Sequence, residues 1–163
     1  SEKIAHKLID QAKKCGADIV KFQIFDANKL STKTVQKPNY IKKNFNLKKK
    51  SQFEILKKLE LSFKQINKIN NFCKKKKIEF LLSPFDIESI IKLKKLNLRR
   101  VKIPSGEINN YPYLKEIAKL NKKIILSTGM SFIREIKDAI NILNLHGIKK
   151  KKIVHHLIKF KHV

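Results

Sequence analysis

The chain has 163 residues, of which 42% are hydrophobic, so it is long enough to bury the core of one ordinary domain. No apolar run approaches the length that spans a membrane, and the first residues show no signal-peptide pattern. Cys15 and Cys73 are too few and too far apart for a disulfide scaffold or a zinc cluster. We therefore expect a cytoplasmic protein with no membrane partner.

The net charge of +26 raises the question of an acidic partner. Only three of the 39 basic residues are arginines, and the lysines are spread over helix faces and loops. Nucleic-acid readers rely on arginine for paired hydrogen bonds to bases and phosphates. We interpret the excess as compositional drift toward lysine and expect no specific nucleic-acid partner, only weak, salt-sensitive adhesion.

The N-terminal part predicts a helix followed by a strand. Apolar residues recur at helical spacing over 2–15, and Gly16 is suited to end that helix. A strand over 19–25 follows, with a lysine that the apolar pattern predicts to be buried. Because side chains alternate along a strand, Lys21 and Gln23 are expected to point to the same face.

Residues 26–50 are polar and predict a long irregular loop, which inside an α/β unit is functional or disordered. Tyr40 and Phe45 are candidate anchoring contacts within it, and ordinary surface packing is the alternative. The next two segments, about 51–59 and 62–76, each begin with the spacing of a capping box and predict two helices.

The remainder alternates strands with helices. Strands are expected near 79–83, 100–104, 123–127 and 152–157, and helices over 86–96, after Asn109 or Asn110, and over 131–145. Three of these strands run into a serine, at a constant step of 22 residues: Ser83, Ser105 and Ser127. One step is the length of a βα unit, which predicts parallel strands in sequence order with helices outside.

The segment 101–107 combines several polar groups at the end of an apolar strand. Lys102 interrupts the strand, and Ser105, Gly106 and Glu107 follow where the chain must turn. A lysine, a hydroxyl, free backbone and a carboxylate form a candidate site for an anion and a polyol, whereas a snorkelling lysine beside an ordinary turn is the alternative. The repeated serines favour the site, because polar groups at successive strand ends are typical of α/β active sites.

Several segments resemble one family in order and spacing over about residues 1–147, with 148–163 divergent: Ala17–Gln23, Ser51–Leu61, Glu79–Asp86, Lys102–Glu107 and Ile125–Met130. They are similar to the sialic acid synthases, the phosphoenolpyruvate-dependent N-acetylneuraminate synthase family, which includes legionaminic and pseudaminic acid synthases. The Pro-Ser-Gly-Glu form at 104–107 looks more like the neuraminate and legionaminate branch.

The resemblance implies an incomplete TIM barrel over 1–163, corresponding to about strands 2–6 of the family's (β/α)₈ fold. It implies a transferase that condenses phosphoenolpyruvate with an N-acylated mannosamine-type sugar in nonulosonate biosynthesis. A divalent metal, manganese or magnesium, would activate the sugar aldehyde, and the family assembles as homodimers. The alternatives are a non-catalytic anion-binding partial barrel and a basic nucleic-acid-associated protein.

The resemblance also assigns roles by position. Four residues look like binders of the phosphate and carboxylate of phosphoenolpyruvate: Lys21, Lys102, Ser105 and Ser127. Gln23 and Glu107 look like sugar contacts, with Glu107 as the catalytic candidate. Ser83 is a further substrate-binding candidate, because it stands where many members have threonine.

Two family features have no counterpart in the sequence. The family's first strand, with its Asn-His-Asn-Gly pattern, and its metal-binding histidines fall outside the matching region. His155 and His156 are poor metal candidates, so we expect no metal ligands in this chain. On this interpretation the 163 residues are a truncated fragment, and we expect them to be inactive alone.

Overall fold

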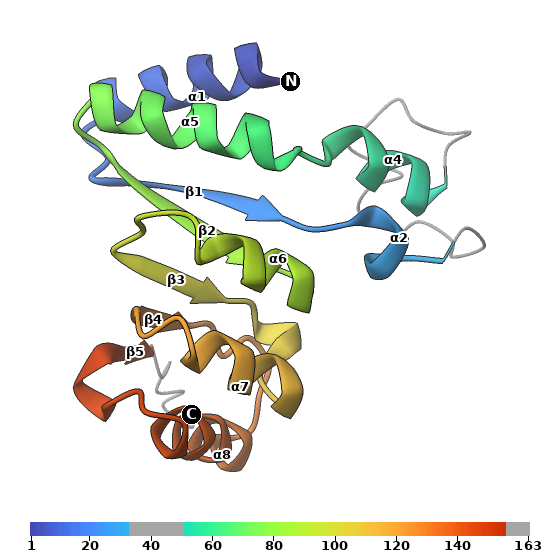
Figure 1. Cartoon of the computed structure of the whole chain (residues 1–163), viewed down its shortest axis with the longest axis vertical. Coiled ribbons are helices and arrows are strands. Elements are labelled where there is room, and N and C mark those ends of the chain that lie inside the picture. Colours follow the sequence, from blue (N-terminus) through green and yellow to red (C-terminus); the bar gives the residue numbers. More distant parts are fainter. Residues whose placement is uncertain (33–50, 156–163) are drawn as a thin grey trace, which may run out of the picture.

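The computed structural model describes residues 1–32 and 51–155, which form one parallel sheet covered by helices (Figure 1). The five strands lie side by side in sequence order, and each neighbouring pair is parallel. Their bounds are β1 Ile19–Ile24, β2 Glu79–Pro84, β3 Arg100–Ile103, β4 Lys123–Leu126 and β5 Ile153–His155. The predicted α/β class and parallel strand order are confirmed.

Helices connect the strands, in the arrangement of a partial (β/α)₈ barrel. Their bounds are α1 Glu2–Lys14, α2 Ala27–Leu30, α4 Gln52–Leu59, α5 Phe63–Lys75, α6 Ile87–Leu93, α7 Tyr111–Ala118 and α8 Ile133–Leu145, with short 3₁₀ turns η1 Ser105–Glu107 and η2 Lys150–Lys152. The predicted capping boxes open α4 and α5, where Ser51 and Ser62 accept from backbone N–H groups three residues on. Asn110 caps α7 in the same way.

The expectation of an irregular loop from residue 26 onward is wrong at its start, because 27–30 form α2. Asp26 begins this helix by accepting a hydrogen bond from Asn28 N–H at 3.0 Å. A single short turn of this kind has no apolar periodicity by which to recognise it. Tyr40 and Phe45 lie outside the described residues.

The two faces of the sheet differ in composition. The face toward the helices carries the apolar core, with side chains at most 9% exposed: Val20, Ile24, Phe80, Leu82, Val101, Ile103, Ile124 and Leu126. The opposite face carries the alternate residues, including both strand lysines. Lys21 is exposed and Lys102 half-buried, so the prediction that Lys21 is buried is wrong: its strand is apolar on one face only.

Within the described ranges, no helix is long and apolar enough to cross a membrane. Cys15 is exposed and Cys73 buried, and both are free thiols. Burial raises the pKa of the Cys73 thiol to about 11, so it is an inert core residue at neutral pH. The cytoplasmic location stays a prediction.

Candidate anion site at the carboxyl ends of the strands

The strand register brings the predicted polar residues to one face. In the strand register, Gln23 of β1 lies opposite Ser83 of β2, and Lys102 of β3 lies opposite Ile125 of β4. Leu82 pairs with Val101, which places Ser83 level with Lys102. Since side chains at one level of a parallel sheet point the same way, Gln23 and Lys102 share a face, together with Lys21 two residues back. The predicted site depends on this shared face.

The two strand lysines are close enough to affect each other. Partial burial lowers the pKa of Lys102, and the positive charge of Lys21 lowers it further. Neither ammonium has an ion pair within the described part of the chain, whereas other lysines, such as Lys76 and Lys57, do. Two uncompensated cations on one face create a positive potential that an anion would relieve.

A hollow of about 430 Å³ opens beside Lys102, at the carboxyl ends of β3 and β4. Its walls are formed by Lys102, Ser105, Ile125, Leu126, Ser127, Thr128, Gly129 and Val154. Three predicted phosphoenolpyruvate binders, Lys102, Ser105 and Ser127, therefore meet at one cavity. Lys21 does not line the cavity, but its positive charge lowers the pKa of Lys102. One cation and several hydroxyls around a small cavity suit a phosphate or carboxylate group.

Gly129 determines how closely the wall of this hollow can pack, and the sequence analysis did not single it out as a site residue. Its φ is +49°, in the left-handed region that favours glycine. A Cβ built there would lie 2.7 Å from both Cβ and Oγ of Ser105. The loop after β4 therefore reaches Ser105 only because residue 129 has no side chain. The glycine in Ser-Thr-Gly, just after a strand, was the available signal.

The other predicted residues lie near the hollow but not on its wall. Ser83 is 1% exposed, and its Oγ donates to the backbone carbonyl of Lys102 at 3.0 Å, which fixes β2 against β3. Glu107 is half-buried in η1, and its Oε2 accepts from Asn110 Nδ2 at 2.7 Å. Gln23 is exposed one strand further away. The chemical roles of all seven residues stay predictions.

Partly and fully buried hydrogen bonds tie the ends of β1 and β2 to α6 and α7, and the sequence analysis missed them. Asp86 accepts from the backbone N–H of Asp26 at 3.0 Å and from Ser89 Oγ at 2.7 Å, which ties the end of β1 to α6. Tyr113 is buried, and its hydroxyl donates to the Pro84 carbonyl at 2.8 Å. Burial raises the pKa of Tyr113 far above its usual range, so it stays a donor at any physiological pH.

The side chains of the described residues form no group that could hold a metal ion. Over 1–32 and 51–155, no three His, Cys, Asp or Glu side chains converge as a ligand group. The metal that the resemblance implies is therefore not assigned to any residue here, and no chemical step is derived through it.

A comparison with protein families matches residues 8–159 to the NeuB family. The chain belongs to the NeuB family. Two relatives are named N,N'-diacetyllegionaminic acid synthase: one from Campylobacter jejuni is 50% identical over 151 residues, and one from Legionella pneumophila is 43% identical over 138. The match covers 92% and 85% of this chain but 45% and 38% of those proteins. This NeuB chain thus spans less than half the length of these relatives.

The fold agrees with that of solved NeuB-type structures. The N-acetylneuraminic acid synthetase of Leptospira borgpetersenii superposes with a TM-score of 0.76 at 23% identity, over 94% of this chain and 48% of that one. At that identity the likeness establishes the fold alone. It confirms the predicted partial-barrel arrangement of parallel strands with outer helices.

Proposed function

We propose that this chain is the phosphoenolpyruvate-binding part of a sialic acid synthase-type enzyme, which joins phosphoenolpyruvate to an N-acylated mannosamine-type sugar. The observation that carries the proposal is the hollow that Lys102 lines together with the hydroxyls of Ser105 and Ser127. Lys21 shares the face of Lys102, and neither lysine has an ion pair among the described residues. The family membership and the names of the relatives support it.

The chemistry of phosphoenolpyruvate suits this arrangement. The molecule carries a phosphate and a carboxylate, so a binder needs separated positive charges together with hydroxyl donors. Lys102 and the two serines would hold one anionic group in the hollow, and Lys21 would attract the other. Fixed charges of this kind also stabilise the negative charge that grows on the phosphate as it leaves.

The reaction that the family resemblance implies involves no net oxidation or reduction, so it needs no oxidant or reductant. Carbon 3 of phosphoenolpyruvate forms a bond to the sugar aldehyde carbon, whose oxygen takes a proton. Water then adds at carbon 2, and the phosphate departs with cleavage of the C–O bond. Glu107 is the carboxylate nearest in sequence to the anion binders, and we assign it to the sugar side of the site, where a proton must be held or moved.

For the sugar, we propose a diacetylated precursor of the legionaminate type. The Pro-Ser-Gly-Glu form of residues 104–107 favours the neuraminate and legionaminate branch, and the two legionaminic acid synthases among the relatives favour legionaminate within it. A divalent metal and a homodimer are part of the same proposal, on the resemblance alone.

The test compares two lysine variants in a calorimetric titration with phosphoenolpyruvate at moderate salt. We expect the unaltered chain to bind at about millimolar strength, near −4 kcal/mol. Lys102→Met should abolish this binding. Lys123→Met is the matched control, because Lys123 pairs with Arg100 at the opposite end of the sheet, on the same face as Lys102.

The control should bind as the unaltered chain does. If both variants bind equally well, the anion coats the lysine-rich surface and the proposed site does not exist.

A further inference from the structure

The connections that lead into the strands are rich in lysine. Lys13 and Lys14 precede β1, Lys74–Lys77 precede β2, Lys94, Lys95, Arg99 and Arg100 precede or begin β3, Lys119, Lys122 and Lys123 precede or begin β4, and Lys149–Lys152 precede β5. In the sequence these groups are far apart and resemble scattered surface charge.

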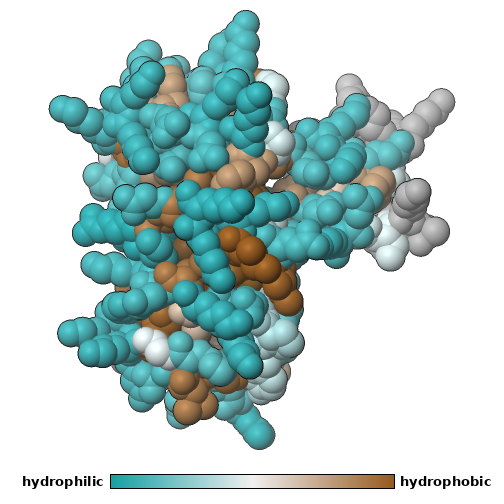
Figure 2. All heavy atoms as spheres, in the orientation of Figure 1, coloured by the Kyte–Doolittle hydropathy of each residue, from teal (hydrophilic) through white to brown (hydrophobic). Residues whose placement is uncertain are grey.

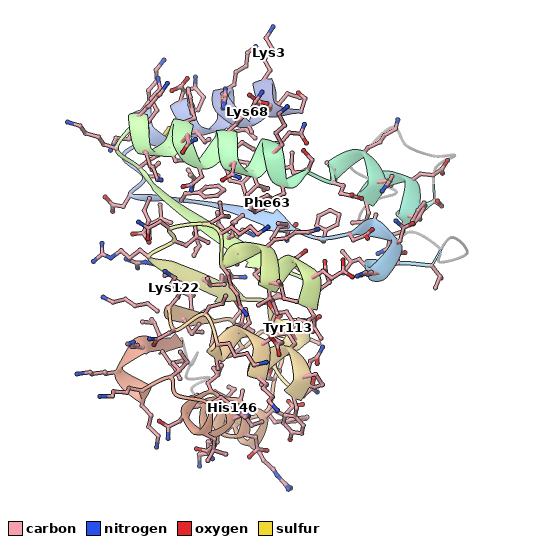
Figure 3. All side chains as sticks on the ribbon, viewed as in Figure 1. Lys3, Phe63, Lys68, Tyr113, Lys122 and His146 are labelled. Atoms are coloured by element: carbon pink, nitrogen blue, oxygen red, sulfur yellow. The ribbon has the colours of Figure 1, made fainter. Side chains whose placement is uncertain are left out.

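The parallel topology gathers these groups at one end of the molecule. Because all strands run the same way and lie in sequence order, their first residues share one edge of the sheet, opposite the hollow. Strand spacing makes that edge about 19 Å wide. Figure 2 shows hydrophilic side chains projecting along the left margin, where the strands of Figure 1 begin, and Lys122 lies on that side in Figure 3. We call this surface the basic end.

The charge of the basic end is largely uncompensated. Glu79 pairs with both Arg99 and Arg100, Asp10 pairs with Lys76, and Glu116 pairs with Lys119. The remaining lysines of the basic end have no ion pair within the described ranges. Lysines in the last turn of a helix are favoured by the helix dipole, but the cluster extends beyond the helices to positions such as Lys77 and Lys149.

The chemistry of the basic end points to one kind of partner. We propose that the basic end binds the phosphate backbone of nucleic acid without reading its sequence. Lysines are flexible point charges that detect charge density, and the two arginines that could make paired contacts are engaged by Glu79. The five connections contain no Phe, Tyr or Trp on which a base could stack.

A membrane surface is the less favoured partner. Peripheral proteins that bind anionic lipid commonly insert apolar side chains beside their lysines. Among the large exposed apolar side chains of the described residues, only Ile91 and Leu145 lie in the last turns of helices that lead into the basic end, and they are on different helices. A surface with many charges and two separate apolar side chains suits a phosphodiester backbone better.

The test separates the position of the lysines from the total charge. A labelled 20-base-pair duplex of mixed sequence is titrated with the full chain between about 50 and 200 mM salt, and anisotropy is followed. One variant replaces four lysines of the basic end by glutamine: Lys74, Lys75, Lys150 and Lys151. The control variant replaces four exposed lysines on helices away from the basic end: Lys3, Lys7, Lys58 and Lys64. Both variants have the same net charge.

We expect the basic-end variant to lose about tenfold or more in affinity, and the logarithmic salt slope to fall by about 0.9 for each phosphate contact removed. The control should stay within about twofold of the unaltered chain, and thermal unfolding by circular dichroism should show that both variants fold. Equal losses in the two variants, or no binding at the lowest salt, would overturn the proposal. So would tighter binding to phosphatidylglycerol vesicles than to the duplex at the same salt, because that outcome assigns the surface to membranes.

Discussion

At the scale of single residues, the candidate site depends on the contact between Gly129 and Ser105. The two residues come from loops that follow different strands, and the missing side chain lets those loops meet at the hollow. Ser105 and Ser127 are thereby brought to the same small volume as Lys102. The positions of the binding groups thus depend on a residue that has no functional group itself.

Replacing Gly129 with alanine should therefore impair anion binding as well as stability. The new methyl group would lie 2.7 Å from Ser105 and force the two loops apart. We expect affinity for phosphoenolpyruvate to fall at least about tenfold, which is 1.4 kcal/mol, in the same calorimetric titration.

Gly147→Ala is the matched control for this substitution. Gly147 also has a positive φ, +97°, but a Cβ there would meet nothing within 4 Å. It should cost stability through backbone strain alone and leave the affinity unchanged. If the two variants bind phosphoenolpyruvate equally well, Gly129 does not position the site.

Part of the site was predictable from residues in one strand and its following turn. Lys102, Ser105 and Ser127 follow from polar groups at strand ends, and they do meet at the hollow. Gly129 was missed because its role depends on a loop contact between two βα units, which no local pattern encodes. The exposure of Lys21 was missed because the apolar pattern around it does not reveal which face is covered.

At the scale of elements, three helices end in the same way. In α1, α5 and α8 a backbone N–H just past the helix donates to a carbonyl five residues back: Ala17 to Ala12, Ile78 to Cys73 and Ile148 to Leu143. This is the Schellman motif, whose preceding residue adopts a positive φ. Gly16 and Gly147 take that position in α1 and α8, but Lys77 takes it in α5, with φ +53°.

Lys77→Gly should consequently stabilise the protein. A left-handed conformation costs an ordinary L-residue roughly 1–2 kcal/mol, part of which the greater freedom of glycine in the unfolded chain offsets. We expect a net gain of about 1 kcal/mol in the free energy of unfolding, measured by urea denaturation. The reciprocal change Gly16→Lys should destabilise by a similar amount, and an opposite sign for either variant would contradict this account.

The elements themselves were largely predictable. The constant step between the three serines correctly indicated repeated βα units, and the capping boxes correctly located the starts of α4 and α5. The helix expected over 86–96 is shorter, because α6 ends at Leu93 and a turn leads into β3. Composition alone does not distinguish the last turn of a helix from the turn that follows it.

At the scale of the whole molecule, the sheet separates lysines that look alike in the sequence into two groups with different surroundings. Lys102 lies toward the carboxyl ends of the strands, beside a hollow with hydroxyl groups, and Lys21 shares its open face of the sheet. The lysines of the basic end lie at the opposite edge, without such groups. The parallel arrangement of five strands produces this separation. From composition alone the lysine excess was interpreted as compositional drift, because the sequence does not reveal which lysines the fold brings together.

The most direct measurement of the central claim is the activity of a chimera. The matched 151-residue segment of the Campylobacter jejuni relative is replaced by the corresponding residues of this chain, and formation of N,N'-diacetyllegionaminic acid is assayed. We expect the chimera to make product and its Lys102→Met variant to lose at least about a hundredfold in kcat/KM, or 2.7 kcal/mol. A folded chimera without activity, or a Lys102→Met variant as active as the chimera itself, would contradict the claim that these residues form the phosphoenolpyruvate site of a synthase.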